Sequence, residues 1–137
     1  MGEILTVVMR WVHISSVVTL IGGIVYARFV MIPAATSLSS DARTALDEGA
    51  ARQFRPVVFA AIAGLVISGV FNYLSKPGHS VLYHALFGVK MLLALHVFSV
   101  AILVTAPKNS RRARQLFGAA VSGLLIVLIA AYLKGIA

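Results

Sequence analysis

The stretch WVHISSVVTLIGGIVYARFVMIP, residues 11–33, decides the fold of this chain. It is almost unbroken in its apolar character, belongs to a longer apolar segment at 4–32, and ends at a proline. A helix that crosses a membrane needs about 20 mainly apolar residues. The segment is therefore predicted to be a transmembrane helix, and its excess length predicts that it tilts or projects beyond the hydrocarbon.

Three further apolar segments follow, at 56–74, 81–106 and 116–133. Only 12% of the residues are charged and 60% are hydrophobic, whereas soluble domains have roughly 25% charged residues. About four spans with their connections use up the 137 residues. The sequence predicts an all-α integral membrane protein, an up-down four-helix bundle that forms one transmembrane domain over 1–137 in the lipid bilayer.

The connections between the spans predict the topology. Segment 34–55 is polar, and its Ser-Ser-Asp run at 39–41 is typical of a helix start, so we expect a loop with a short helix. KPGH at 76–79 predicts a tight turn between the second and third spans. Basic residues gather in 34–55 and 107–115, which predicts that these loops are cytoplasmic and both termini lie outside, in a bacterial-type inner membrane.

The net charge of +8 fits this arrangement without nucleic acid as a partner. The basic residues lie mostly between the apolar runs, where they can face anionic lipid headgroups. We therefore predict contact with the lipid bilayer and no nucleic-acid binding.

Within apolar segments lie the ionisable side chains of Arg10, His13, Lys90 and His96. A central Arg or Lys costs about 2.5–3.5 kcal/mol on insertion scales, and such residues usually face the bundle interior and mark function. The first and third spans run in the same direction, so His13 and His96 are predicted to face each other as the two axial ligands of a haem iron. The chain has no cysteine, so the haem would be b-type and held without a covalent bond.

The two intramembrane cations are predicted to pair with the haem propionates. Arg10 precedes His13 by three residues and lies on a similar helical face, one turn nearer the outer surface. Lys90 precedes His96 by six residues, which rotates it by about 120° from that histidine. A guanidinium suits a carboxylate because it donates two parallel hydrogen bonds.

Other interpretations of these residues stay open. His84 and His79, near the start of the third span, are substitute ligands or propionate partners, or else solvated residues of the interface. Arg10 is alternatively a residue that snorkels to the headgroups. His13 and His96 are alternatively hydrogen-bonded histidines of the bundle core.

Copper is the alternative cofactor. Met9 lies four residues before His13 on one helical face, and Met91 is near His96. Thioether and imidazole groups suit Cu(I). A copper-handling membrane protein is therefore the second functional class that the sequence supports.

Small residues recur at four-residue spacing on three of the four spans. This pattern lets helix backbones approach closely in lipid, so we interpret it as packing between helices. The residues are Ser15, Thr19 and Gly23, then Ala60, Gly64, Ser68 and Asn72, and finally Gly118 and Ser122.

Three stretches together resemble a known family. The stretch at 11–33, ARQFRPVVFAAIAGLVISGVFNYL at 51–74 and YHALFGVKMLLAL at 83–95 resemble, in this order, the helices of the CopD-like (copper resistance D domain) membrane proteins. The same layout is similar to HemJ, a membrane protein linked to protoporphyrinogen oxidation. The resemblance implies that His13 is a haem ligand and Lys90 a functional partner.

The sequence thus predicts a membrane protein with b-type haem that serves in electron transfer or haem-dependent oxidoreduction. If it is an enzyme, we expect a membrane oxidoreductase, with HemJ-like protoporphyrinogen oxidation as one option. The expected partners are a quinone or a redox protein, and the chain is small enough to form a homodimer. The alternatives are copper handling and a structural or assembly subunit of a membrane complex.

Overall fold

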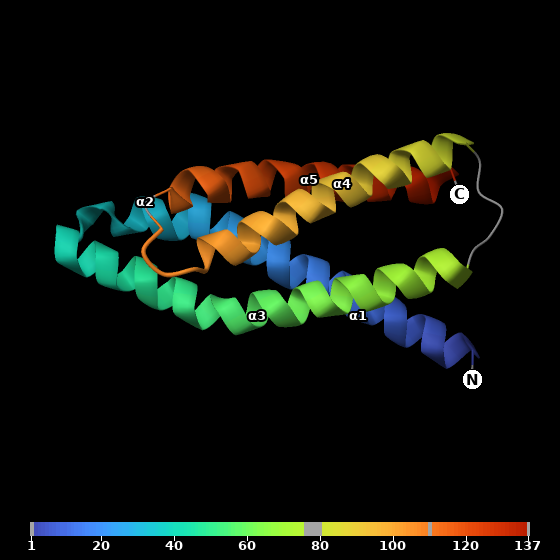
Figure 1. Cartoon of the computed structure of the whole chain (residues 1–137), viewed down its shortest axis with the longest axis horizontal. Helices are drawn as coiled ribbons and strands as arrows, with labels where there is room; N and C mark the ends of the chain where they lie inside the picture. Colours follow the sequence, from blue (N-terminus) through green and yellow to red (C-terminus); the bar gives the residue numbers. More distant parts are fainter. Residues whose placement is uncertain (1, 76–80, 110, 137) are drawn as a thin grey trace.

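All regular structure in the described residues, 2–75, 81–109 and 111–136, is helical in the computed structural model (Figure 1). Its elements, in chain order, are α1 (Gly2–Tyr26), a π-helical turn η1 (Ala27–Met31), α2 (Ile32–Ala34), a 3₁₀ turn η2 (Ala35–Ser37), α3 (Ser40–Ser75), α4 (Val81–Val104) and α5 (Arg112–Ile136). Within the described part, four helices are long and apolar enough to cross a membrane. The predicted all-α four-helix bundle is confirmed.

The long helices pack as two antiparallel pairs, α1 with α3 and α4 with α5. Contact between α1 and α5 joins the pairs, whereas α3 and α4 touch less. Both chain termini lie at one end of the bundle, and α2 and the connection from α4 to α5 lie at the other (Figure 1). The chain therefore runs up and down, and the two predicted basic connections lie at the same end.

The core lies at the centre of the bundle and is made of aliphatic and small side chains. Its members include Leu20, Ile24, Val58, Ala61, Val97, Ala101, Ala119 and Ala120, which are all nearly inaccessible. Many large apolar side chains instead lie on the outside, as expected for helices whose solvent is lipid. The small residues allow close packing, because a Cβ at Gly64 would overlap the hydroxyl of Ser16 on α1.

Helix α3 is longer than the second apolar segment. We expected a short helix in 34–55 that leads into the second span, and residues 40–55 form the first turns of α3 and continue without a break into the apolar section. Ser39 begins this polar section, since its Oγ accepts a hydrogen bond from the N–H of Ala42 at 3.2 Å. Pro56 lies inside the helix and removes one backbone donor without ending it.

The other boundaries differ from the predicted ones by a few residues. Helical turns continue past Pro33, because this proline occupies the first turn of α2, where its missing N–H needs no partner. Helix α5 begins at Arg112, earlier than the apolar segment at 116–133. The predicted tight turn at 76–79 lies outside the described residues.

Candidate functional site

His13 lies on α1 and is fixed by a hydrogen bond to α3. Its Nδ1 is 2.9 Å from Oγ of Ser68, a fully buried side chain. The Ser68 hydroxyl donates its own proton to the carbonyl of Leu65 at 3.3 Å. While the Ser68 hydroxyl donates to Leu65, it can only accept from Nδ1, and in that tautomer of His13 the lone pair lies on Nε2.

A cavity of about 190 Å³ lies beside His13, between the four long helices. Its walls are formed by His13, Val17, Leu20 and Ile21 of α1, Leu65, Val66, Gly69 and Val70 of α3, Lys90, Met91, Ala94, Val97 and Phe98 of α4, and Ile126 of α5. Val66, Val70 and Met91 are exposed, at 49%, 54% and 38%. The cavity therefore reaches the outer surface between α3 and α4, which touch less than the helices within each pair.

Lys90 is the cation that the fold brings to His13. It is half-buried on α4 and lines the same cavity. Within the described ranges its ammonium group has no hydrogen-bond or ion-pair partner. Arg10 also lies on α1 but is exposed and does not line the cavity, so the fold places only one of the two predicted propionate partners there.

His96 is fixed in the same way as His13, but on another face. Its Nδ1 is 2.9 Å from Oγ of Ser122 on α5, and a Cβ at Gly118 would lie 3.9 Å from its Cε1. The His96 side chain is exposed and does not line the cavity of His13. The two histidines predicted to share one iron thus pack in different helix pairs, and the structure brings Lys90, not His96, into the cavity of His13.

The remaining predicted site residues lie apart from this cavity. His84 is exposed near the start of α4. His79 lies outside the described residues. Met91 lines the cavity together with His13, whereas Met9 does not. In the part of the chain that the structure describes, no three His, Cys, Asp or Glu side chains gather as a metal-binding group.

The two serines are site residues that our sequence analysis assigned only to packing. Each helix pair has the same arrangement, in which a histidine of the first helix binds a serine of the second. In both pairs a glycine precedes this serine by four residues, Gly64 before Ser68 and Gly118 before Ser122. The shared Gly-x-x-x-Ser spacing, taken with the intramembrane histidines, was the sequence signal for this role.

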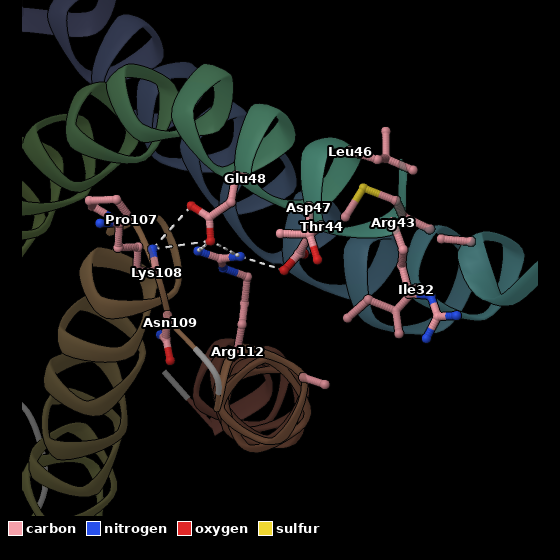
Figure 2. A pocket seen from close by; sticks show the side chains of 13 residues that line it. Ile32, Arg43, Thr44, Leu46, Asp47, Glu48, Pro107, Lys108, Asn109 and Arg112 are labelled. Carbon is pink, nitrogen blue, oxygen red and sulfur yellow. Dashed lines mark hydrogen bonds and ion pairs between the residues drawn. The ribbon is translucent and has the colours of Figure 1, made fainter. Parts of the chain in front are cut away.

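A second polar cluster joins the helix pairs at the end of the bundle opposite the termini (Figure 2). Arg112 of α5 is only 4% exposed and pairs with Asp47, at 2.5 Å, and Glu48, at 3.4 Å, on α3. It also donates to the carbonyls of Val104 and Ala106, at 2.6 and 2.7 Å. From the sequence, the basic residues of 107–115 were interpreted only as determinants of membrane topology, and this buried ion pair was not predicted.

Glu48 also binds the connection between α4 and α5. Both of its carboxylate oxygens accept the backbone N–H of Lys108, at 3.0 and 3.1 Å. This hydrogen bond, with the nearby Arg112 guanidinium, holds the pKa of the Glu48 carboxyl below its ordinary value. The cluster therefore ties the polar section of α3 to the second helix pair.

No protein-family model, curated protein or solved structure matches this sequence.

Proposed function

We propose that this chain is an integral membrane b-type haem protein that serves in electron transfer or haem-dependent oxidoreduction. The observation that carries the proposal is the hydrogen bond between Nδ1 of His13 and Oγ of Ser68, which suits the tautomer with its proton on Nδ1. Histidines that bind metals almost always donate their other ring N–H to a fixed partner. His13 thus offers its Nε2 lone pair as an iron ligand at the depth of the hydrocarbon.

The residues around His13 fit the chemistry of a haem. The cavity walls are apolar apart from His13 and Lys90, and the Lys90 ammonium suits a propionate carboxylate. The cavity of about 190 Å³ is smaller than the 300–1,000 Å³ of typical ligand pockets, so a haem would also occupy the opening between α3 and α4. A bound haem would supply one-electron chemistry at its iron, and the residues of this chain would hold it and exclude water.

His96 and Arg10 stay predicted haem contacts. The bond from Nδ1 of His96 to Ser122 supports a role as a ligand, because it orients the ring as Ser68 orients His13. Its exposed position separates it from the His13 cavity, so its part is tested independently of His13. Arg10 lies one turn from His13 towards the terminus, on the exposed side of α1.

Copper handling is the second candidate function, and one contact favours it. Met91 and His13 line the same cavity, and thioether and imidazole together suit Cu(I). A cavity of about 190 Å³ is ample for a single ion. The neighbouring Lys90 ammonium opposes a cation there, which is why we favour haem.

For the cellular setting we propose a bacterial-type inner membrane with both termini outside. The bundle end that carries α2 and the connection between α4 and α5 holds most of the basic residues, among them Arg43, Arg52, Lys108, Arg111 and Arg114. The positive-inside rule would place this end in the cytoplasm. Labelling of single cysteines introduced at Ser39 and Gly2 in intact cells tests this orientation.

The absorption spectrum of the purified protein tests the proposed function. The chain is expressed with haem available, purified in mild detergent, and analysed for its Soret band, reduced α and β bands, and copper content. We expect a b-type spectrum that is lost in His13→Ala and weakened in His96→Ala. His84→Ala is the matched control, because it removes an exposed histidine of α4 away from the cavity.

Three results would contradict the haem proposal in different ways. A colourless protein with stoichiometric copper would support the copper candidate. A colourless protein without metal would favour a structural or assembly role. An unchanged Soret band in both His13→Ala and His96→Ala would show that haem binds elsewhere.

A further inference from the structure

A cavity of about 720 Å³ lies at the end of the bundle opposite the termini (Figure 1), and Figure 2 shows the side chains that line it. It lies between the end of the first span, the polar section of α3 and the start of α5, and its floor is the buried side chain of Arg112. Its volume is within the range of 300–1,000 Å³ that is typical of ligand sites. Nothing in the proposed haem function uses this cavity.

The charged side chains that line the cavity carry a net positive charge. Arg112 pairs with both Asp47 and Glu48. The Lys108 charge also acts on the Glu48 carboxylate, so the three cations outnumber the two carboxylates by one. Arg43 and Lys108 also line the cavity, are exposed, and have no carboxylate within ion-pair distance in the ranges described.

Arg43 and Lys108 are drawn on either side of the Arg112 cluster (Figure 2). Arg43 donates to the carbonyl of Leu38 at 3.3 Å, which leaves most of its five N–H donors unused. The cavity therefore offers positive charge to an anion at two points of its rim.

The rest of the lining is largely apolar and continues the outer surface of the bundle. Met31 and Ile32 end the first apolar segment, and Leu46, Pro107 and Ala113 extend this wall. The cavity thus lies where the apolar spans give way to the polar section of α3, and we expect the lipid headgroups at this level. A ligand that fits it carries an anionic group next to an apolar part.

We propose that this cavity binds the headgroup of an anionic phospholipid, with Arg43 and Lys108 at the phosphate and the apolar wall beside the acyl chains. Basic pockets at the ends of transmembrane helices are known to hold anionic headgroups, and each Lys or Arg near such a surface contributes about 1 kcal/mol. The Arg112 ion pair shapes the floor of the site and leaves the two rim cations to bind.

Thermal unfolding of the purified full-length chain in detergent tests the proposal. Unfolding is followed during titration with phosphatidylglycerol, with phosphatidylcholine of the same acyl chains, and with glycerol phosphate. We expect phosphatidylglycerol to raise the unfolding temperature and the other two to raise it little. Arg43→Gln with Lys108→Asn should weaken the apparent affinity about 30-fold. Asparagine is chosen because Lys108 has φ of 57°, which this residue tolerates.

The matched control is Arg52→Gln with Arg114→Gln. Both arginines are exposed at the same end of the bundle and do not line the cavity, so the control removes the same net charge. We expect it to keep most of the response to phosphatidylglycerol. An equal loss in both double variants would overturn the site in favour of general surface attraction. An equal effect of glycerol phosphate on the wild type would overturn the lipid as source and assign a soluble phosphate ester.

Discussion

Oγ of Ser68 lies 2.9 Å from Nδ1 of His13 and 3.3 Å from the carbonyl of Leu65 on its own helix. Both residues lie in helices long and apolar enough to cross a membrane, where an unpaired polar group costs several kcal/mol. The serine thus satisfies one nitrogen of the imidazole and orients the ring. In the tautomer with its proton on Nδ1, the lone pair of the proposed ligand lies on Nε2.

Replacement of this serine should weaken haem binding without removing the ligand. In Ser68→Ala the ring of His13 loses its partner, and loss of such a partner typically costs 10–100-fold in metal affinity. We expect a similar loss of haem affinity, measured by titration of the apoprotein with haemin and by the Soret absorbance. Ser15 lies on α1 close to His13, but within the described residues it has no hydrogen bond to a histidine. Ser15→Ala should therefore bind haem with the affinity of the wild type. Equal haem affinities of Ser68→Ala and the wild type would show that the hydrogen bond between Ser68 and His13 does not contribute to haem binding.

Loss of the Arg112 ion pair should destabilise the bundle. Arg112→Ala leaves Asp47 and Glu48 without their cation and two backbone carbonyls without a donor. Hydrogen bonds to charged groups contribute about 1.5–3 kcal/mol, and we expect a loss of this size in the free energy of unfolding. Thermal or denaturant unfolding in detergent measures it. Arg111→Ala, at the exposed neighbouring position, should change stability by less than about 0.5 kcal/mol.

The same cluster predicts weaker stability in acid. The pKa of Glu48 is lower in the folded chain than its ordinary value of 4.5, so folding favours the ionised carboxylate. The stabilisation from Glu48 is therefore complete above pH 4.5 and is lost as the pH falls through the lower, folded pKa. Unfolding temperatures of the wild type and Glu48→Gln should converge as the pH is lowered through this range. Parallel curves would exclude Glu48 as the group responsible.

Hydrophobic patterning predicted the fold because lipid leaves few options for a chain of this composition. Long apolar segments must form helices to satisfy their backbone, so the four spans and their alternation follow from the sequence. A short helix in 34–55 that leads into the second span was predicted, but not that the two form one unbroken helix, because Pro56 and the polar residues before it resemble a boundary. In the structure Asp47 and Glu48 of this polar section bind Arg112, a contact between elements that the sequence pattern does not show.

The sequence identified the residues of the candidate site, but not how they are arranged in space. The intramembrane histidines and Lys90 stand out because ionisable groups are rare in spans. Helical rotation placed Lys90 off the face of His96, as the structure has it, but no sequence pattern fixes which of these faces points inward. The partners Ser68 and Ser122 were hidden because serine is also a common packing residue in membrane helices.

The contact between α1 and α3 at Gly64 should be sensitive to a single added methyl group. A Cβ there would overlap the hydroxyl of Ser16 and lie 3.3 Å from the side chain of Val12. Overpacking of this kind typically costs 1–3 kcal/mol, so we expect Gly64→Ala to lower the unfolding temperature. Gly69→Ala is the matched control on the same helix, because its Cβ would have no atom within 4 Å. Equal stability of both variants would show that α1 and α3 can separate at this point without cost.

Substitution of Lys90 should change stability and haem affinity in opposite directions. Its ammonium lies in an apolar cavity without a partner in the described residues, which is costly at this depth. Lys90→Met fills similar space without charge, so we expect the apoprotein to unfold at a higher temperature than the wild type. The same variant should bind haem more weakly, because a propionate would lose its cation, and Lys90→Arg should restore part of the affinity. A residue kept for packing would show the opposite result, with lower stability in Lys90→Met and unchanged haem affinity in both variants.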